Sequence, residues 1–418
     1  MQTSVEHAAV RRPGRRLITA VVAMGLLLSA CGGPDDSTAD KAPPIPETPA
    51  GDHLRWTLDQ LNGGAADLQA ADVSARFSPA FLELTPAPQI LEVLQQSAAE
   101  RGPFTFIAFA QPPTPTMVVA LVSTAGERAA VRIATEAAGA HRITSMELGD
   151  PPPTMPPGPD TGSVDIGGRQ IFLLCTGQGS PTVVLEGGTT ADWLPIHDAV
   201  AQVARVCSYD RANGPWSRSD PAPMPRTGRD VVDDLHAVLA AAKVPGPYVL
   251  AGHSNGGLFA QLFTRLHGDE VAGLVLIDAV HVDYQDRRLA LINSLPAPGQ
   301  PAGAQALPRP QFIDPEAQIL LDETLAEVRA AIATTALPAV PLRVLTHGKP
   351  APADFPPGTP DAADATLWLQ LQTELTGLVP GARQVVANDS GHDIPSEDPE
   401  LVVGTITEVV RAARAGTS

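Results

Sequence analysis

The chain has 418 residues, 44% of them hydrophobic, which is enough for two domains with a sizeable core. Its net charge of −18 excludes a nucleic-acid-binding protein, because so acidic a chain offers no basic face to neutralise phosphates. The sequence shows neither a zinc-ligand cluster nor a glycine-rich phosphate loop, so we expect no metal and no organic cofactor.

Residues 1–30 have the layout of an export signal. Four arginines between Arg11 and Arg16 precede an apolar run over residues 17–28. The run is too short for a comfortable transmembrane span. The sequence "LSAC" that follows resembles the lipobox of bacterial lipoproteins. That resemblance implies that Cys31 is lipidated and anchors the mature chain to the extracytoplasmic face of the cell membrane. The alternative is an ordinary signal peptide cut nearby, with Cys31 incidental.

Residues 31–51 are rich in Pro, Asp and Thr and predict a flexible tether. Residues 52–148, in which helical rhythms precede four strand-like stretches, predict a small α+β domain. This segment looks like the small N-terminal domain, related to cystatin or NTF2-like folds, that precedes catalytic domains in some actinobacterial lipoproteins. It holds no reactive constellation, so we expect packing, docking or binding to a partner of unknown identity. Residues 149–160 form a Pro-rich linker.

From residue 161 to residue 418 the pattern changes to alternating strands and helices. Short continuous apolar runs such as "PTVVLEGG", "PYVLAGHS" and "AGLVLIDAV" are typical of strands that are covered on both faces. The alternation predicts a mostly parallel sheet with helices on both sides.

The stretch Gly252-His253-Ser254-Asn255-Gly256 is a G-x-S-x-G that falls between a predicted buried strand and a predicted helix. A nucleophile elbow needs a sharp, strained turn there, with small neighbours on both sides of the serine. The two glycines meet that need, and we therefore predict that Ser254 is a nucleophile. The alternative is an inert serine in a glycine-rich turn.

A serine hydroxyl needs a general base, and the base in turn needs a third group to hold it. His392 lies in a Gly-His turn between the last predicted strand and the last helix, and we predict that it is the base. We interpret His281 as a loop or pocket residue and His253 as structural.

Two carboxylates are candidates for the third group. Asp278 ends the strand "LVLID", and a rigid strand end would hold a histidine well. Asp354 lies along a Pro-rich loop after "VLTHG", which would hold it poorly. We favour Asp278, keep Asp354 as the alternative acid, and note that Asp278 could instead bond to loop amides.

The oxyanion of an acyl-transfer intermediate needs two hydrogen-bond donors. We expect these to be the backbone amides of Asn255, directly after the serine, and of Gly188 in "LEGG". Elsewhere, Cys175 and Cys207 are either a disulfide, as an exported chain permits, or two buried thiols.

With these motifs in this order, residues 164–415 resemble the α/β-hydrolase superfamily of esterase- and lipase-like serine hydrolases. The resemblance implies an eight-stranded, mostly parallel sheet with a cap between strands six and seven, at about residues 284–338. Within that cap we predict a helix from about Pro315 to Thr334. It also implies that the strands of Cys175 and Cys207 are neighbours, which supports the disulfide. One loop departs from the superfamily pattern, because its two customary glycines are replaced by Asn213 and Pro215.

The leading hypothesis is a membrane-tethered serine hydrolase that cleaves a small-molecule or lipid carboxylic ester through an acyl-enzyme. An amidase, a thioesterase or a lactonase would use the same residues. The competing class is a non-catalytic cell-envelope binding lipoprotein that retains the fold.

Overall fold

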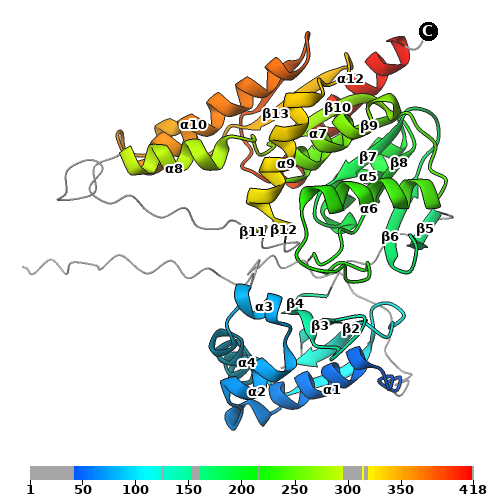
Figure 1. Ribbon diagram of the computed structural model, residues 1–418, viewed down its shortest axis with the longest axis vertical. Helices are drawn as coiled ribbons and strands as arrows, with labels where there is room; N and C mark the ends of the chain where they lie inside the picture. The colour runs from blue at the N-terminus through cyan, green and yellow to red at the C-terminus, as the bar shows by residue number, and fades with distance from the viewer. Residues whose placement is uncertain are drawn as a thin grey trace, which may run out of the picture. The chain divides into compact units, whose positions relative to one another are not determined.

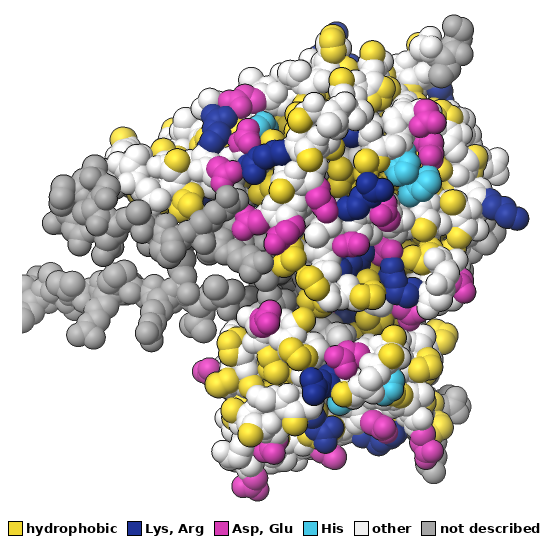
Figure 2. Space-filling model, in the orientation of Figure 1, with side chains coloured by type: hydrophobic (Ala, Val, Ile, Leu, Met, Phe, Trp, Pro, Cys, Tyr) yellow, Lys and Arg dark blue, Asp and Glu magenta, His cyan; other side chains and the backbone are white. Residues whose placement is uncertain are grey.

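The computed structural model describes residues 42–124, 127–151, 160–214, 216–294, 313–314 and 319–416. The predicted signal peptide and Cys31 lie outside the described residues, as do parts of the tether and of the Pro-rich linker. From Ala42 onward the described residues belong to one compact unit, which contains a four-stranded and an eight-stranded sheet (Figure 1). On the face shown in Figure 2, side chains of both charge signs are interspersed with apolar ones.

The small N-terminal domain has its helices before its strands, as predicted. The helices are α1 (Pro49–Leu61), α2 (Ala70–Arg76), α3 (Pro79–Leu84) and α4 (Ala87–Arg101). The strands are β1 (Phe104–Phe109), β2 (Met117–Thr124), β3 (Glu127–Thr135) and β4 (Ile143–Gly149), and they pair antiparallel in the order β1-β2-β3-β4.

Helix α1 begins earlier than the predicted domain start at residue 52. The Thr48 hydroxyl accepts a hydrogen bond from the amide of Gly51 at 3.2 Å, and Pro49 occupies the first turn, where its missing N–H costs nothing. Residues 49–51 are therefore part of the folded domain and not of the tether. Leu54, Leu58 and Leu61 then recur on one buried face of the helix, which packs on the core of the sheet.

The second sheet has eight strands, which confirms the predicted architecture. They are β5 (Asp160–Asp165), β6 (Gln170–Thr176), β7 (Thr182–Glu186), β8 (Val206–Tyr209), β9 (Tyr248–His253), β10 (Val271–Ile277), β13 (Leu342–His347) and β14 (Arg383–Ala387). Their order is β14-β13-β10-β9-β7-β8-β6-β5; β6 pairs antiparallel with β5 and β8, and the other pairs are parallel.

Helices cover both faces of this sheet, as its continuous apolar strands predict (Figure 1). Helices α6 (Gly228–Ala241), α7 (Gly256–Leu266) and α9 (Leu321–Thr334) share one apolar core with the strands. Helices α5 (Leu194–Ala201) and α12 (Pro399–Gly416) share the other. Two shorter elements, η2 (Thr190–Trp193) and α11 (Ile394–Glu397), lie next to the site described below.

The segment between β10 and β13 differs from the prediction in one boundary. Helix α9 ends at Thr334 as expected, but it begins at Leu321 and not at about Pro315. The reason is that β12 (Ile319–Leu320) is extended and pairs antiparallel with β11 (Ile313–Asp314). Helix α8 (Tyr284–Ser294) opens the segment.

Helix α10 (Pro360–Leu375), between β13 and β14, was not predicted from the sequence. The Thr359 hydroxyl caps it by accepting the amide of Ala362 at 3.3 Å, and Pro360 occupies its first turn. The helix buries Trp368, Leu371 and Leu375.

Cys175 and Cys207 form a disulfide, which confirms the pairing that the family resemblance supports. The two residues lie directly opposite each other on the antiparallel strands β6 and β8, and both are buried. Because the bond closes a loop with a sequence separation of 32, it limits the freedom of the unfolded chain.

We predict that the double variant Cys175→Ala/Cys207→Ala loses about 3–4 kcal/mol of unfolding free energy, the loop-closure entropy for this separation. Denaturant titration of both proteins without reductant measures the difference, and peptide mapping under non-reducing conditions checks the bond. Wild-type protein in reductant should match the variant. Equal stability of the oxidised wild type and the variant would contradict the prediction.

Candidate active site

Ser254 sits on a strained turn between strand β9 and helix α7. Its φ is 56°, in the left-handed region that a residue with a side chain rarely adopts, and its amide donates to the carbonyl of Ile277 at 3.1 Å. The two flanking glycines are sterically required. A Cβ on Gly252 would lie 2.4 Å from the carbonyl oxygen of Gly256, and a Cβ on Gly256 would lie 2.2 Å from that of Glu186. The turn has the geometry of the predicted nucleophile elbow.

His392 reaches the serine from the turn that follows β14. Its Nε2 lies 3.0 Å from the Ser254 Oγ, and its Nδ1 lies 2.6 Å from the Oδ2 of Asp278. In the tautomer that fits both contacts, Nδ1–H donates to the carboxylate and Nε2 accepts from the hydroxyl. The structure thus brings together three of the residues that the sequence singled out.

Asp278 follows β10 and is fully buried. Its φ is 43°, so two residues on neighbouring strand ends adopt the left-handed conformation. The Asp278 amide donates to the carbonyl of Leu345 at 2.8 Å, and the amide of Val280 donates to the carbonyl of Ser254 at 3.0 Å. The first bond holds the carboxylate turn to β13, and the second, with the bond from the Ser254 amide to Ile277, fastens the serine turn and the carboxylate turn to each other.

The buried carboxylate receives further donors from two residues that the sequence did not single out. His347 ends β13 and donates its Nδ1–H to Oδ2 at 2.6 Å and its backbone N–H to Oδ1 at 3.2 Å. Trp368 on α10 donates its indole N–H to Oδ1 at 2.9 Å. Burial alone would raise the pKa of Asp278, but hydrogen bonds from His347 and His392 hold that pKa well below its ordinary value. The group is therefore a carboxylate at neutral pH.

One of these partners had a signal in the sequence. His347 ends a strand next to β10, so both strand ends lie on the same edge of the sheet. Trp368 had none, because its helix shows no clear amphipathic period and its indole reaches Asp278 only through the tertiary fold.

The alternative acid, Asp354, is occupied elsewhere. It is exposed at the end of η4 (Pro352–Asp354), where its carboxylate accepts the backbone amide of Ala351 at 2.7 Å. Asp278, and not Asp354, is the carboxylate hydrogen-bonded to His392.

His253 and His281 occupy supporting positions. The Nε2–H of His253 donates to the backbone carbonyl of His392 at 2.8 Å, and the two rings lie 4.8 Å apart. Burial, followed by the neighbouring His392, lowers the pKa of His253, which favours its neutral form. His281 accepts the amide of Asp283 at 3.1 Å in the loop after β10.

The expected oxyanion donors lie on two loops that are packed together. The close approach of Gly256 to the carbonyl of Glu186 places the backbone after β7 against the elbow. In that loop the carbonyl of Gly188 accepts the amide of Arg211 at 3.1 Å. Asn255 is the N-cap of α7, and its carbonyl accepts the first bond of the helix, from Leu258 at 2.9 Å.

The loop after β8, in which Asn213 and Pro215 replace the customary glycines, still has a residue in the left-handed conformation. Asn213 has a φ of 64°, a conformation that asparagine tolerates better than most residues. Its side chain accepts the amide of Ala222 at 3.0 Å and donates to the carbonyl of the same residue at 3.1 Å. Pro215 lies outside the described residues.

Asp278, His347 and His392 also have ligand atoms within 4.8 Å of one another. However, the Nδ1 atoms of both histidines point at the same carboxylate oxygen, 2.6 Å away. We therefore describe the group as a hydrogen-bonded cluster and not as a metal-ligand set.

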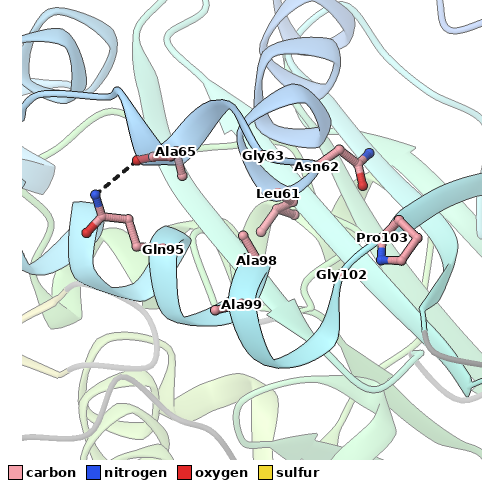
Figure 3. Close-up of a pocket in the computed structure, with 10 residues that line it drawn as sticks. Leu61, Asn62, Gly63, Ala65, Gln95, Ala98, Ala99, Gly102 and Pro103 are labelled. Carbon is pink, nitrogen blue, oxygen red and sulfur yellow. Dashed lines mark hydrogen bonds between the residues drawn. The ribbon is translucent and has the colours of Figure 1, made fainter.

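A separate pocket lies in the small domain. It encloses about 400 Å³ and is lined by residues between Leu61 and Pro103, from α1, η1 (Gly64–Ala66) and α4 (Figure 3). Gln95 donates to the carbonyl of Ala65 at its rim. Its lining contains no titratable side chain and no residue of the Ser254 site.

Two protein-family models match parts of the chain. The profile described as "Alpha/beta hydrolase family" matches residues 177–405, and the one described as "ORF 12 gene product N-terminal" matches residues 45–140. Among curated relatives, "Uncharacterized protein YqjL" of Bacillus subtilis (strain 168) is 24% identical over 57% of this chain and 86% of its own length. "Probable transporter efuK" of Hormonema carpetanum is 25% identical over 62% of this chain and 44% of its own. The chain thus spans less than half the length of that second relative.

Solved structures show a distant similarity. The hydrolase CumD, a meta-cleavage product hydrolase of Pseudomonas fluorescens IP01, is 15% identical, with 61% of this chain and 99% of its own covered at a TM-score of 0.43. A thermophilic esterase of Thermogutta terrifontis is 21% identical, with 60% and 98% covered at a TM-score of 0.39. Similarities at these TM-scores support no inference about activity. The family assignment rests on the sequence match, which spans more than half of the chain: this protein belongs to the alpha/beta hydrolase family.

Proposed function

We propose that this chain is a serine hydrolase that cleaves carboxylic esters through an acyl-enzyme. The observation that supports this most is the hydrogen-bonded series from Ser254 through His392 to Asp278, with 3.0 Å and 2.6 Å between the bonded atoms. The three groups follow one another in the order that nucleophilic catalysis needs.

In the first half of the reaction, the Ser254 Oγ attacks the ester carbonyl while His392 Nε2 takes the hydroxyl proton. Asp278 stabilises the imidazolium that forms. The tetrahedral intermediate collapses, His392 returns the proton to the leaving alcohol, and the acyl group stays on Ser254. In the second half, a water molecule gives a proton to His392 Nε2 and attacks the acyl carbon. The new tetrahedral intermediate collapses, the Ser254 Oγ leaves with that proton, and the acid is released. In this scheme no step uses a metal or an organic cofactor.

The negative charge of the tetrahedral intermediate would be held by the backbone amides of Gly188 and Asn255. Loss of one such donor typically costs about 2.7–4 kcal/mol of barrier. The same residues could open thioesters, lactones or amides, so the leaving group is decided by turnover assays and not by this geometry.

The proposal extends to location and to the small domain. Lipidation of Cys31 would anchor the exported chain on the extracytoplasmic face of the membrane, where a small-molecule or lipid ester is the expected substrate. Within the described ranges, no helix is both long and apolar enough to cross a bilayer. The small domain would be of the cystatin or NTF2-like kind, in keeping with its helices and its antiparallel sheet.

We predict that Ser254→Ala abolishes labelling by a fluorophosphonate probe and lowers ester turnover by roughly 10⁴-fold or more, because the attacking oxygen is gone. Gel fluorescence and hydrolysis of short p-nitrophenyl esters measure the two effects. Ser74→Ala, at an exposed serine of α2, is the control and should behave as wild type. Label that persists in Ser254→Ala would refute the nucleophile assignment. A folded wild type that neither labels nor turns over would favour a non-catalytic binding protein.

We predict that Asp278→Asn lowers kcat by roughly 10³–10⁴-fold, while Asp354→Asn stays within about 2-fold of wild type. The asparagine keeps the size of the side chain but removes the charge that stabilises the imidazolium. Steady-state kinetics on the two folded variants decide between the carboxylates. A larger loss in Asp354→Asn would reverse the assignment.

We predict that His347→Phe moves the acid limb of the kcat/KM profile to higher pH. Without the His347 donor, the charge of Asp278 acts more strongly on His392 and favours the protonated ring, which cannot act as a base. The pH dependence of ester hydrolysis from pH 4 to pH 9 measures the shift. His347→Gln retains a donor and should leave the limb closer to wild type. An unmoved limb in His347→Phe, with only lower stability, would indicate a packing role.

A further inference from the structure

Arg132, on β3 of the small domain, is a fully buried cation outside the Ser254 site. Its Nη1 pairs with the carboxylate of Glu147 on β4 at 2.9 Å and bonds the Ser145 hydroxyl at 2.9 Å. Its Nε donates to the carbonyl of Ser217, in the hydrolase domain, at 2.9 Å. A buried charge is costly unless it is paired and hydrogen-bonded, so this position is specified by its partners on both sides.

The partner segment, Trp216–Ser219, is strained at its first residue. Trp216 has a φ of 54°, which for a bulky side chain costs about 1–3 kcal/mol and persists only where the surroundings hold it. The holding contacts come from β4: the Trp216 amide donates to Glu147 at 2.6 Å, and its indole ring lies against Gly149. A Cβ at position 149 would lie 3.1 Å from the ring.

The same segment is linked to the loop after β7 by hydrogen bonds through Asp210. The backbone amide and the guanidinium of Arg218 both donate to the buried carboxylate of Asp210, at 2.8 and 2.7 Å. Asp210 also accepts the amide and the hydroxyl of Thr190, at 2.8 and 2.9 Å. Next to Asp210, the amide of Arg211 donates to the carbonyl of Gly188. Residues 188–190 are thus fixed by bonds that begin at the segment which Arg132 and Glu147 hold.

We propose that Arg132 and Glu147 are positioning residues, through which the small domain holds the Trp216–Ser219 segment and, by way of Asp210, the oxyanion loop at residues 187–190. The small domain is then a working part of the active site and not only a spacer. This inference rests on the proposed function for its catalytic meaning.

A purely adhesive role for Arg132 predicts something different. If Arg132 and Glu147 only attach the small domain to the hydrolase domain, their loss lowers stability and leaves the loop after β7 unchanged. If they position the oxyanion loop, their loss loosens that loop while the rest of the hydrolase sheet stays protected. Amide hydrogen exchange separates these cases without requiring turnover.

Arg132→Lys is the test variant, because lysine keeps a charge for Glu147 but has no Nε–H to donate to Ser217. We expect amides of residues 186–193 and 210–219 to exchange about 5- to 10-fold faster, and those of β10 to stay unchanged. On short p-nitrophenyl esters, kcat should fall by about 10- to 100-fold with little change in KM, since a misplaced donor weakens only the transition state. Arg128→Lys, at an exposed arginine of the same strand, is the matched control.

Unchanged exchange in residues 186–193 of a folded Arg132→Lys variant overturns the inference. Glu147→Gln is the second variant and is read in the same way, so that poor folding of one variant does not decide the result. A wild type that neither labels nor turns over would refute the proposed function, whereas the exchange data would still decide whether the small domain holds the loop.

Discussion

The buried carboxylate of Asp278 is the group on which the geometry of the active site depends. A desolvated carboxylate is stable only when it is surrounded by donors, and here they come from β13, from α10 and from the turn after β14. Each of these elements must therefore reach the same edge of the sheet for the charge to be tolerated. The catalytic geometry proposed for His392 is a consequence of satisfying that charge, because its Nδ1–H is one of the required donors.

The backbone at this edge of the sheet is constrained as well. Ser254 and Asp278 both follow neighbouring parallel strands in the left-handed conformation, and main-chain bonds cross between their turns. Left-handed φ values at two residues with side chains cost about 1–3 kcal/mol each. That cost is offset because the turns share hydrogen bonds and because Gly252 and Gly256 allow the close approach. The bonds that offset the strain therefore also fix the positions of Ser254 and Asp278.

Much of this could be predicted from the sequence, for identifiable reasons. Strand and helix periods locate Ser254, His392 and Asp278, because all three lie in turns that follow strands, on the edge where parallel sheets gather their functional side chains. The role of Trp368 could not be predicted, since it depends on where α10 packs. The disulfide required knowledge of strand order, which no local pattern contains. The buried Arg132 looked like any arginine in a strand, because its partners are distant in sequence.

The location of the acid also explains why the loop after β13 can be Pro-rich. An acid on that loop would have to be held rigidly, since a small displacement of the histidine is costly for catalysis. With Asp278 directly after β10, the loop after β13 does not have to carry the acid, and its first residues, Gly348 and Lys349, instead donate backbone amides to the carbonyl of Ser390 in the turn that holds His392. Asp354 is then free to cap its own 3-10 turn at the surface. Because the charge is buried at the end of β10, the need to hold an acid does not constrain the composition of that loop.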